Sequence, residues 1–276
     1  VTARSADNDY TSGSGSIAFT GAVGETKTVD VIVKGDTKVE ANETFKVILS
    51  AITGASGKNV TIPAGVPGNG KEGVGTITND DNATLAINSV STVEGNSGSH
   101  TLTFDVTLSM AVEDGLKVNY TTADDAAITT DGDYLAKSGQ LTFVGTTNEI
   151  QQIVITVNGD EKVELDEIFK VNLSTIAPVT APAGTITFAD DSGDGTITND
   201  DAAVLSISGL TVNENAGTAN FTVSMNYAVQ GAFTIDFATS DNTAVNGTDY
   251  TNTTSTLNFG GANPLSQTVS IPILDG

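Results

Sequence analysis

The sequence contains no cysteine and no tryptophan, and it has a single histidine, His100, among its 276 residues. Without cysteine, the chain has neither disulfides nor thiolate metal sites, and its redox compartment cannot be inferred from cysteine usage. The joint absence of cysteine and tryptophan removes the core signature of antibody-type domains. Soft metals would lack their usual ligands here, so metal chemistry at this chain would depend on oxygen. We expect His100 on the surface.

Positive charge is also scarce. The chain has 11 Lys and Arg against 34 Asp and Glu, which gives a formal net charge of -23. Phosphate backbones and anionic membrane surfaces are therefore poor partners, whereas cations are good ones. No run of about 18 apolar residues could span a bilayer. No charged and then apolar leader is present either, so any secretion signal is expected outside these residues.

What the sequence does contain is typical of β structure. Thr, Val, Ile, Asn, Asp and Gly dominate, and no long stretch has helical periodicity. With 38% hydrophobic residues the chain can still form apolar cores. The composition predicts an all-β protein with many turns.

Internal repeats define the organisation of the chain. "GTITNDD" stands at 75–81 and again at 195–201, and each copy is followed by a new strand-like stretch. "GDTKVEANETF" at 35–45 is likewise repeated as "GDEKVELDEIF" at 159–169. We therefore predict three units: a first unit at 1–82 without its N-terminal part, a complete middle unit at 83–201, and a third unit at 202–276 without its C-terminal part.

The middle unit shows the alternation of half-buried strands. Leu102, Phe104, Val106 and Leu108 share one face of a strand, with polar residues between them. Similar runs lie near Leu85 and at 115–122, 139–145, 150–159, 168–175 and 195–199. About seven strands in one unit predict a seven-stranded antiparallel β-sandwich of immunoglobulin-like architecture, repeated in tandem.

The segment at 159–169 crowds five carboxylates around one lysine, Lys162. If this segment coils for one or two turns, Asp160, Glu164 and Glu167 share a face, which costs stability unless a cation binds there. A solvated charge run is the simpler alternative, but the repeat at 35–45 argues against it. Carboxylate and amide oxygens suit calcium, which tolerates irregular geometry better than magnesium does.

The order of these motifs resembles the Calx-beta domain. "VxEGxxG" is followed by "GDY", "GxLxF", "IxVxxxxDxxxExxExFxVxLS" and "GTITNDD", and the pattern covers the chain as one complete and two partial copies. This family is known from sodium/calcium exchangers, integrin subunits and large bacterial surface proteins. The resemblance implies repeats of a large bacterial-type surface protein.

The resemblance also implies calcium ligands from four places that converge at one end of each sandwich. In the middle unit the matching residues are Glu94, Asp133, Asp160, Glu164, Glu167, Asn199, Asp200 and Asp201. In the first unit they are Asp9, Asp36, Glu40, Glu43, Asn79, Asp80 and Asp81. In the third unit they are Glu214, Asp249 and Asp275, which form an incomplete site.

Two departures from the family pattern indicate fewer ions or weaker binding. Gly159 and Gly35 stand where strong binders begin the acidic loop with another aspartate. Asn199 and Asn79 replace the first acid of the closing triplet.

The acidic residues also allow two other interpretations, a calcium-binding EF-hand loop and an enzyme active site. Residues 190–201 have the spacing of an EF-hand loop, but their flanks are predicted strands rather than helices. Paired carboxylates also serve glycosidases, yet the same acids recur in successive units, whereas an enzyme needs one site. No G-x-S-x-G, P-loop or dinucleotide motif is present, so we predict that the chain is not an enzyme.

We predict an extracellular or cell-surface structural and adhesive array whose junctions are stiffened by calcium. Its partners would be calcium ions, neighbouring repeats of the same or another copy, and a surface glycan or protein. One alternative is a carbohydrate- or protein-recognition module that uses the variable loops at 61–73 and 180–194. Another is a subunit of a surface filament that is completed by strand exchange between chains.

Overall fold

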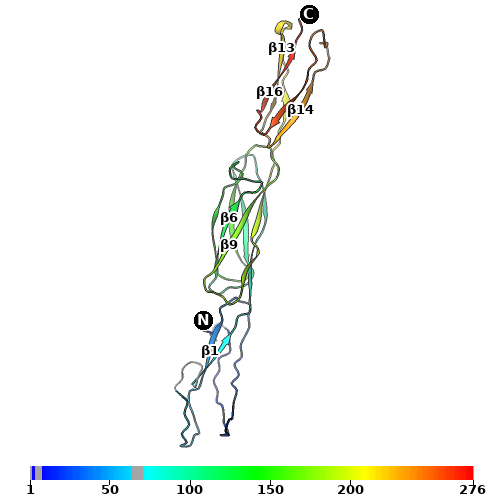
Figure 1. The fold of residues 1–276 in the computed structure, drawn as a ribbon. Helices are drawn as coiled ribbons and strands as arrows, with labels where there is room; N and C mark the ends of the chain where they lie inside the picture. The colour runs from blue at the N-terminus through cyan, green and yellow to red at the C-terminus, as the bar shows by residue number, and fades with distance from the viewer. Residues whose placement is uncertain (1, 4–7, 64–70, 276) are drawn as a thin grey trace.

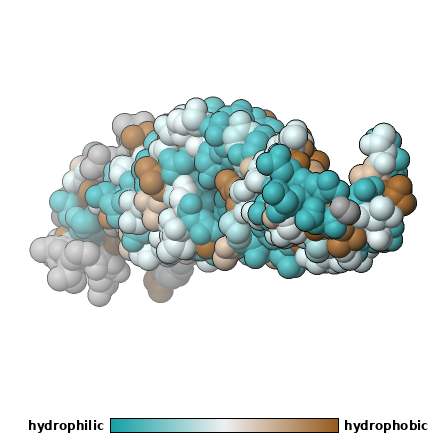
Figure 2. All heavy atoms as spheres, turned by 90° about the horizontal axis from the view of Figure 1, so that it is seen from above, coloured by the Kyte–Doolittle hydropathy of each residue, from teal (hydrophilic) through white to brown (hydrophobic). Residues whose placement is uncertain are grey.

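The computed structural model describes residues 2–3, 8–63 and 71–275. Figure 1 shows the three units arranged end to end as a long, narrow molecule, with the middle unit in green. The face in Figure 2 is mostly hydrophilic, and its hydrophobic side chains are scattered or in small groups. Among the described residues, no helix is long and apolar enough to cross a membrane.

Strands make up nearly all of the regular structure. The first unit contains β1 (Glu43–Ile48) and β2 (Glu72–Ile77). The middle unit contains β3 (Ala83–Ile87), β4 (Val90–Val93), β5 (Ser99–Leu108), β6 (Leu116–Ala123), β7 (Ser138–Phe143), β8 (Glu149–Asn158), β9 (Glu167–Pro178), β10 (Ile186–Asp190) and β11 (Ser192–Thr198). The third unit contains β12 (Leu205–Ile207), the short 3-10 helix η1 (Glu214–Ala216), β13 (Thr218–Met225), β14 (Ala232–Ala238), β15 (Thr254–Gly260) and β16 (Ser266–Pro272).

The middle unit is a two-sheet sandwich, which confirms the predicted class. One sheet has the order β10-β3-β5-β8 and the other has the order β4-β11-β9-β6-β7. The alternating residues of β5 are buried as predicted, and they pack with residues of β9 in one apolar cluster. Within it the Phe169 ring stacks on Tyr134 at a centroid distance of 4.3 Å and meets Phe104 edge-on.

The strand count of the middle unit is nine rather than seven. The first predicted strand is divided into β3 and β4, which lie in different sheets. Asn88 and Ser89 interrupt its apolar run at the crossing, where they accept hydrogen bonds from the backbone N–H groups of Asp105 and Asp194. β4 pairs parallel with β11, and β10 pairs parallel with β3, so the sheets are mixed rather than purely antiparallel.

The connection at 180–194 is less of a free loop than predicted. It contains β10 and the first residues of β11, and β11 pairs antiparallel with β9. The same pairing excludes the EF-hand interpretation of 190–201, because these residues are strand and their flanks are not helices. Residues 64–70 of the other variable loop lie outside the described residues.

The two outer units differ in their number of strands and in the size of their apolar contacts. The third unit has a three-stranded sheet, β12-β13-β16, and a two-stranded sheet, β14-β15, with an apolar cluster of its own. The first unit has the β1-β2 pair, in which Phe45 opposes Gly75 as Phe169 opposes Gly195 in the middle unit. Tyr10 stacks on Phe45 at 5.0 Å, as Tyr134 does on Phe169.

The two junctions between units are built in the same way. Val39, in the acidic loop of the first unit, forms a parallel bridge with Val112 of the middle unit. Val163, at the same place in the second acidic loop, forms a parallel bridge with Val229 of the third unit. Each loop valine donates and accepts one backbone hydrogen bond, with N–O distances of 2.8–3.0 Å. The acidic loop is therefore also the docking segment for the next unit.

Candidate metal centre

Three carboxylates of the middle unit meet at the end that faces the third unit. One ligand oxygen from each of Asp133, Glu164 and Glu167 lies within 4.8 Å of the others. Asp133 precedes the core residue Tyr134, Glu164 lies in the acidic loop, and Glu167 begins β9. Asp133 and Glu167 are buried, at 8% and 7% exposure. Segments far apart in the sequence thus place acids in one small volume.

Backbone hydrogen bonds hold these acids in position. The Ile128 N–H donates to Asp133 Oδ2 at 2.7 Å, and the Asn158 N–H donates to the Asp133 carbonyl at 2.9 Å. Glu167 is fixed by its strand, where it pairs with Ile197 of β11. The cluster is therefore part of the sandwich framework.

The acidic loop has no helical turn. Residues 159–166 are irregular, with one isolated bridge at Val163, so the helical arrangement of Asp160, Glu164 and Glu167 was wrong. Asp160 instead turns the chain locally, because its Oδ1 accepts the Lys162 N–H at 2.6 Å. Glu164 and Glu167 still converge, since the loop leads directly into β9.

Further predicted acids surround this cluster. Glu94 follows β4 and is buried, and its N–H donates to the Thr198 carbonyl at 3.0 Å. Asp200 Oδ1 accepts the Gly95 N–H at 2.9 Å. Asp201 Oδ1 accepts the side-chain amide of Asn96, whereas its Oδ2 is buried and has no hydrogen-bond partner among the described residues. An unpartnered buried carboxylate oxygen is costly unless a cation binds it.

Asn199 has a connecting role in this arrangement. Its Oδ1 accepts the Glu164 N–H at 3.0 Å, and its Nδ2 donates to the Asp201 carbonyl at 3.1 Å. Asn79 makes the same two contacts in the first unit, with Glu40 and Asp81. An aspartate could not donate the second bond. The asparagine joins the acidic loop to the closing run, which explains the departure from a third acid.

The electrostatics of the middle cluster disfavour the charged acids. Burial, together with the charges of Asp160, Glu164 and other nearby acids, raises the pKa of Glu94 to about 7. Burial likewise raises the pKa of Glu167, with Asp133 adding to the effect. The Lys162 ammonium, which contacts the Glu164 carboxylate, partly offsets the effect of burial on the pKa of Glu164. One ammonium is too little positive charge for this many buried carboxylates.

The first unit repeats the cluster. Asp9, Glu40 and Glu43 each place a carboxylate oxygen within 4.8 Å of the other two, beside a pocket of about 60 Å³ that Asp36, Asp80 and Asp81 also line. Lys38 Nζ lies 2.7 Å from Glu40 Oε1, the counterpart of the Lys162–Glu164 pair. Burial and the contact with Asp9 raise the pKa of Glu43 to about 7.

The two glycines at the departures from the family pattern differ in their surroundings. A Cβ on Gly159 would lie 2.0 Å from the Gly95 carbonyl oxygen, so the backbone leaves no room for an acid. A Cβ on Gly35 would meet nothing within 4 Å. Glycine is therefore sterically required at this position in the middle unit, whereas the first unit has room for a side chain there.

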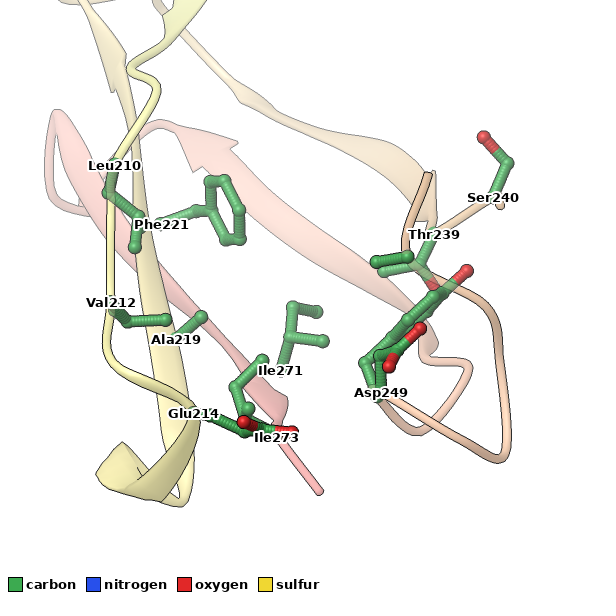
Figure 3. Close-up of a pocket in the computed structure, with 12 residues that line it drawn as sticks. Leu210, Val212, Glu214, Ala219, Phe221, Thr239, Ser240, Asp249, Ile271 and Ile273 are labelled. Carbon is green, nitrogen blue, oxygen red and sulfur yellow. The ribbon is translucent and has the colours of Figure 1, made fainter. Parts of the chain in front are cut away.

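The third unit does not assemble its predicted acids into a cluster of three within its described residues. Glu214 and Asp249 line opposite sides of an apolar pocket of about 490 Å³ between the two sheets (Figure 3). Asp249 Oδ2 accepts the Val245 N–H at 2.7 Å, the counterpart of the Ile128–Asp133 bond. Asp275 is exposed.

Sequence reasoning missed a residue that the next unit adds to the middle cluster. Gln230 follows the bridging Val229, and its Nε2 donates to Glu167 Oε1 at 2.8 Å. The signal was present as a weak repeat, "AVEDG" at 111–115 and "AVQG" at 228–231. The sequence alone does not show that this repeat contacts the acidic loop of the preceding unit.

A comparison with protein families identifies the family to which the three units are similar. The model of the Calx-beta domain matches residues 1–69, 78–202 and 197–276. The chain belongs to the Calx-beta family. No curated protein matches the chain.

Solved structures similar to this Calx-beta chain include CBD12 from CALX1.2, with 19% identity, a TM-score of 0.37, and coverage of 69% of this chain and 76% of that one. The calcium binding domain CBD12 of CALX1.1 has 20% identity, a TM-score of 0.35, and coverage of 69% and 75%. The apo-form Calx CBD1 domain has 19% identity, a TM-score of 0.37, and coverage of 43% and 98%.

The donor set of both Calx-beta clusters fits a hard divalent cation. All candidate ligands are oxygens, the central carboxylates are buried or half-buried, and in each cluster one of them pairs with a lysine. Calcium accepts six to eight oxygens at irregular positions. The residues that would hold it are the carboxylates of each cluster with the surrounding acids, and the ion would supply charge compensation and cross-linking.

Proposed function

We propose that this chain is a calcium-binding structural array in which calcium stiffens the acidic loop at the end of each unit and thereby the junction with the next. The observation that carries this proposal is the position of Val163, which docks on the third unit and directly precedes Glu164 of the cluster. An ion that orders the carboxylates also orders the docking valine.

The proposal is tested by unfolding the whole chain in calcium and in chelator. A ligand at 100 times its Kd stabilises the folded state by about 2.7 kcal/mol, so we expect a higher melting temperature in calcium. Glu164→Ala should reduce this rise, whereas Glu161→Ala, which removes an exposed acid three residues away, should not. Equal midpoints of the unsubstituted chain in calcium and chelator would rule out a stabilising metal.

We further propose that the array works outside the cell, as part of an adhesive surface. Gly159 excludes one acid from the middle cluster and Asn199 replaces another. Fewer acids favour weak sites, and extracellular calcium modules work at Kd values of about 10⁻⁴ to 10⁻³ M. A Kd below about 10⁻⁷ M, measured by calorimetry, would instead indicate a site filled at intracellular calcium levels.

The adhesion partner would be a surface glycan or protein. The connection at 180–194 is largely strand, and its Ala183 N–H donates to the Glu40 carbonyl at 2.8 Å, so any recognition surface there is held in a fixed backbone conformation. Binding to a glycan array that survives loss of the acidic ligands would support a recognition module. Loss of binding with the acids would support calcium-dependent adhesion.

A strand-exchanged filament is a second candidate, favoured by the pocket between the sheets of the third unit. The β1-β2 pair of a second copy has the register of β9-β11, in which Glu43 opposes Ile77 as Glu167 opposes Ile197. Such a pair could add to the third unit of another molecule by β-augmentation. Sedimentation that stays monomeric at all concentrations would reject it.

A further inference from the structure

Val112 and Val229 are the valines on which the loop valines of the preceding units dock, and the residue after each of them faces the acidic cluster of the preceding unit. Glu113 follows Val112 at the first junction, and Gln230 follows Val229 at the second. The N–H of each donates to the carbonyl of the docked valine, from Glu113 to Val39 at 3.0 Å and from Gln230 to Val163 at 2.8 Å. The two positions are therefore structurally equivalent, but one carries an acid and the other an amide.

At the second junction the amide completes a direct contact. Gln230 Nε2 donates to Glu167 Oε1 at 2.8 Å. This bond links the third unit to the middle cluster without an ion.

At the first junction the same place holds two acids. Glu43 is the counterpart of Glu167, and its pKa is raised by burial, by Asp9 and Glu40, and to a smaller extent by the charge of Glu113. Glu113 Oε2 is shielded from solvent and has no hydrogen-bond partner among the described residues. Two facing carboxylates repel each other where an amide would bind. A cation between the units would remove the repulsion and satisfy the buried oxygen.

We propose that Glu113 is a calcium ligand supplied across the unit boundary, so that an ion at the first cluster joins the first unit to the middle unit. This inference rests on the proposed function and deepens it. The metal then joins the two units directly at the first junction, whereas the second junction has, besides its acidic cluster, the metal-independent hydrogen bond of Gln230. Chelation should open the first junction more than the second.

The surrounding charges support a bound cation. Asp9, Glu40 and Glu43 lie together, and the charge of Glu113 acts on Glu43 from the next unit. Lys38 and Lys34 line the pocket beside these acids. The Lys38 ammonium pairs with Glu40 at 2.7 Å, and the Lys34 ammonium donates to Asn8 Oδ1 at 2.7 Å. Two lysines do not balance the six acids that line this pocket.

The two sites can be measured separately because the chain has five tyrosines and no tryptophan. Tb³⁺ seeks oxygen ligands as Ca²⁺ does, and nearby tyrosines sensitise its luminescence. Tyr10 adjoins Asp9 of the first cluster, and Tyr134 adjoins Asp133 of the middle cluster. Tyr134→Phe therefore lowers the signal of the middle site and Tyr10→Phe that of the first site, so the two full-length variants separate the two contributions.

In the Tyr134→Phe chain, we expect Glu113→Gln to weaken Tb³⁺ binding at the first cluster by about 10- to 100-fold, the usual loss when a supporting group of a metal site is removed. Asp114→Asn is the matched control, because it removes the adjacent, exposed acid and should leave this affinity unchanged. In the Tyr10→Phe chain, Gln230→Glu should tighten the middle site.

Hydrogen exchange of residues 36–42 gives a readout of the junction itself. In chelator, Glu113→Gln should slow exchange there, because the amide can reproduce the contact of Gln230. In the unsubstituted chain, calcium should slow it instead. Unchanged Tb³⁺ affinity in Glu113→Gln would overturn this inference and leave the proposed function intact. Absence of any Tb³⁺ and Ca²⁺ binding by the unsubstituted chain would overturn both.

Discussion

Replacing Glu94 with glutamine should have opposite effects in chelator and in calcium. The Glu94 carboxylate is 3% exposed, and its pKa rises from 4.5 to about 7 because of burial and the neighbouring acids. A raised pKa means that the folded state favours the protonated acid. The resulting stability is fully present below pH 4.5 and is lost as the pH rises through about 7.

The size of the stability change follows from the same pKa. One pKa unit corresponds to about 1.4 kcal/mol, so the charged Glu94 costs the folded state about 3 kcal/mol above pH 7 without an ion. Glutamine removes this charge, and we expect Glu94→Gln to stabilise the middle unit in chelator by about 1–3 kcal/mol at pH 7.5. In saturating calcium the variant should instead be the less stable protein, because a ligand is missing.

Hydrogen exchange of strands β5 and β9, corrected for intrinsic rates, measures the stability of the middle unit within the full chain. The exposed Glu161→Gln is the matched control and should change protection little in either condition. If Glu94→Gln lowers protection equally in chelator and calcium, the carboxylate has only a structural role. At pH 5 the stabilisation in chelator should largely disappear, since Glu94 is then protonated.

Four further substitutions test the geometry. Gly35→Asp should tighten calcium binding at the first cluster, whereas Gly159→Asp should destabilise the middle unit, because only the first position has room for a side chain; calorimetry and melting temperature distinguish them. Asn199→Asp should cost about 1–2 kcal/mol in chelator by losing a half-buried donor, measured by urea unfolding; unchanged stability would refute its connecting role. Gly195→Ala should cost about 1–3 kcal/mol, against the usual gain for alanine in a strand, because its Cβ would lie 2.5 Å from the Phe169 ring; a stability equal to or above that of the unsubstituted chain would refute the overlap.

The sequence predicted those features that depend on local pattern. The alternation at Leu102–Leu108 has the burial of a sandwich strand, because a half-buried strand must alternate. The repeated acids did converge in two units, since Glu164 and Glu167 are carried by the segment that leads into β9. The ligand role of these acids stays a prediction.

Other features could not be predicted, because they depend on contacts between distant segments. The crossing of β3 into β4 depends on Asn88 and Ser89, whose partners lie in β5 and β11. The helical arrangement of the acidic loop was wrong because Val163 is held by the next unit, and this pulls the loop into an extended path. A carboxylate pattern alone gives no sign of such a partner.

The two docking valines show how the junctions divide their stability between apolar contact and charge. Val39 is fully buried in the apolar cluster of the middle unit, whereas Val163 is only half-buried against the third unit. Full burial of a valine contributes about 1.5–3 kcal/mol, so the first junction has the stronger apolar contact. It also has the facing acids Glu113 and Glu43, where the second has the Gln230 hydrogen bond. The junction with the greater apolar attraction is thus the one that carries electrostatic repulsion, and a cation that removes this repulsion would have its largest effect there.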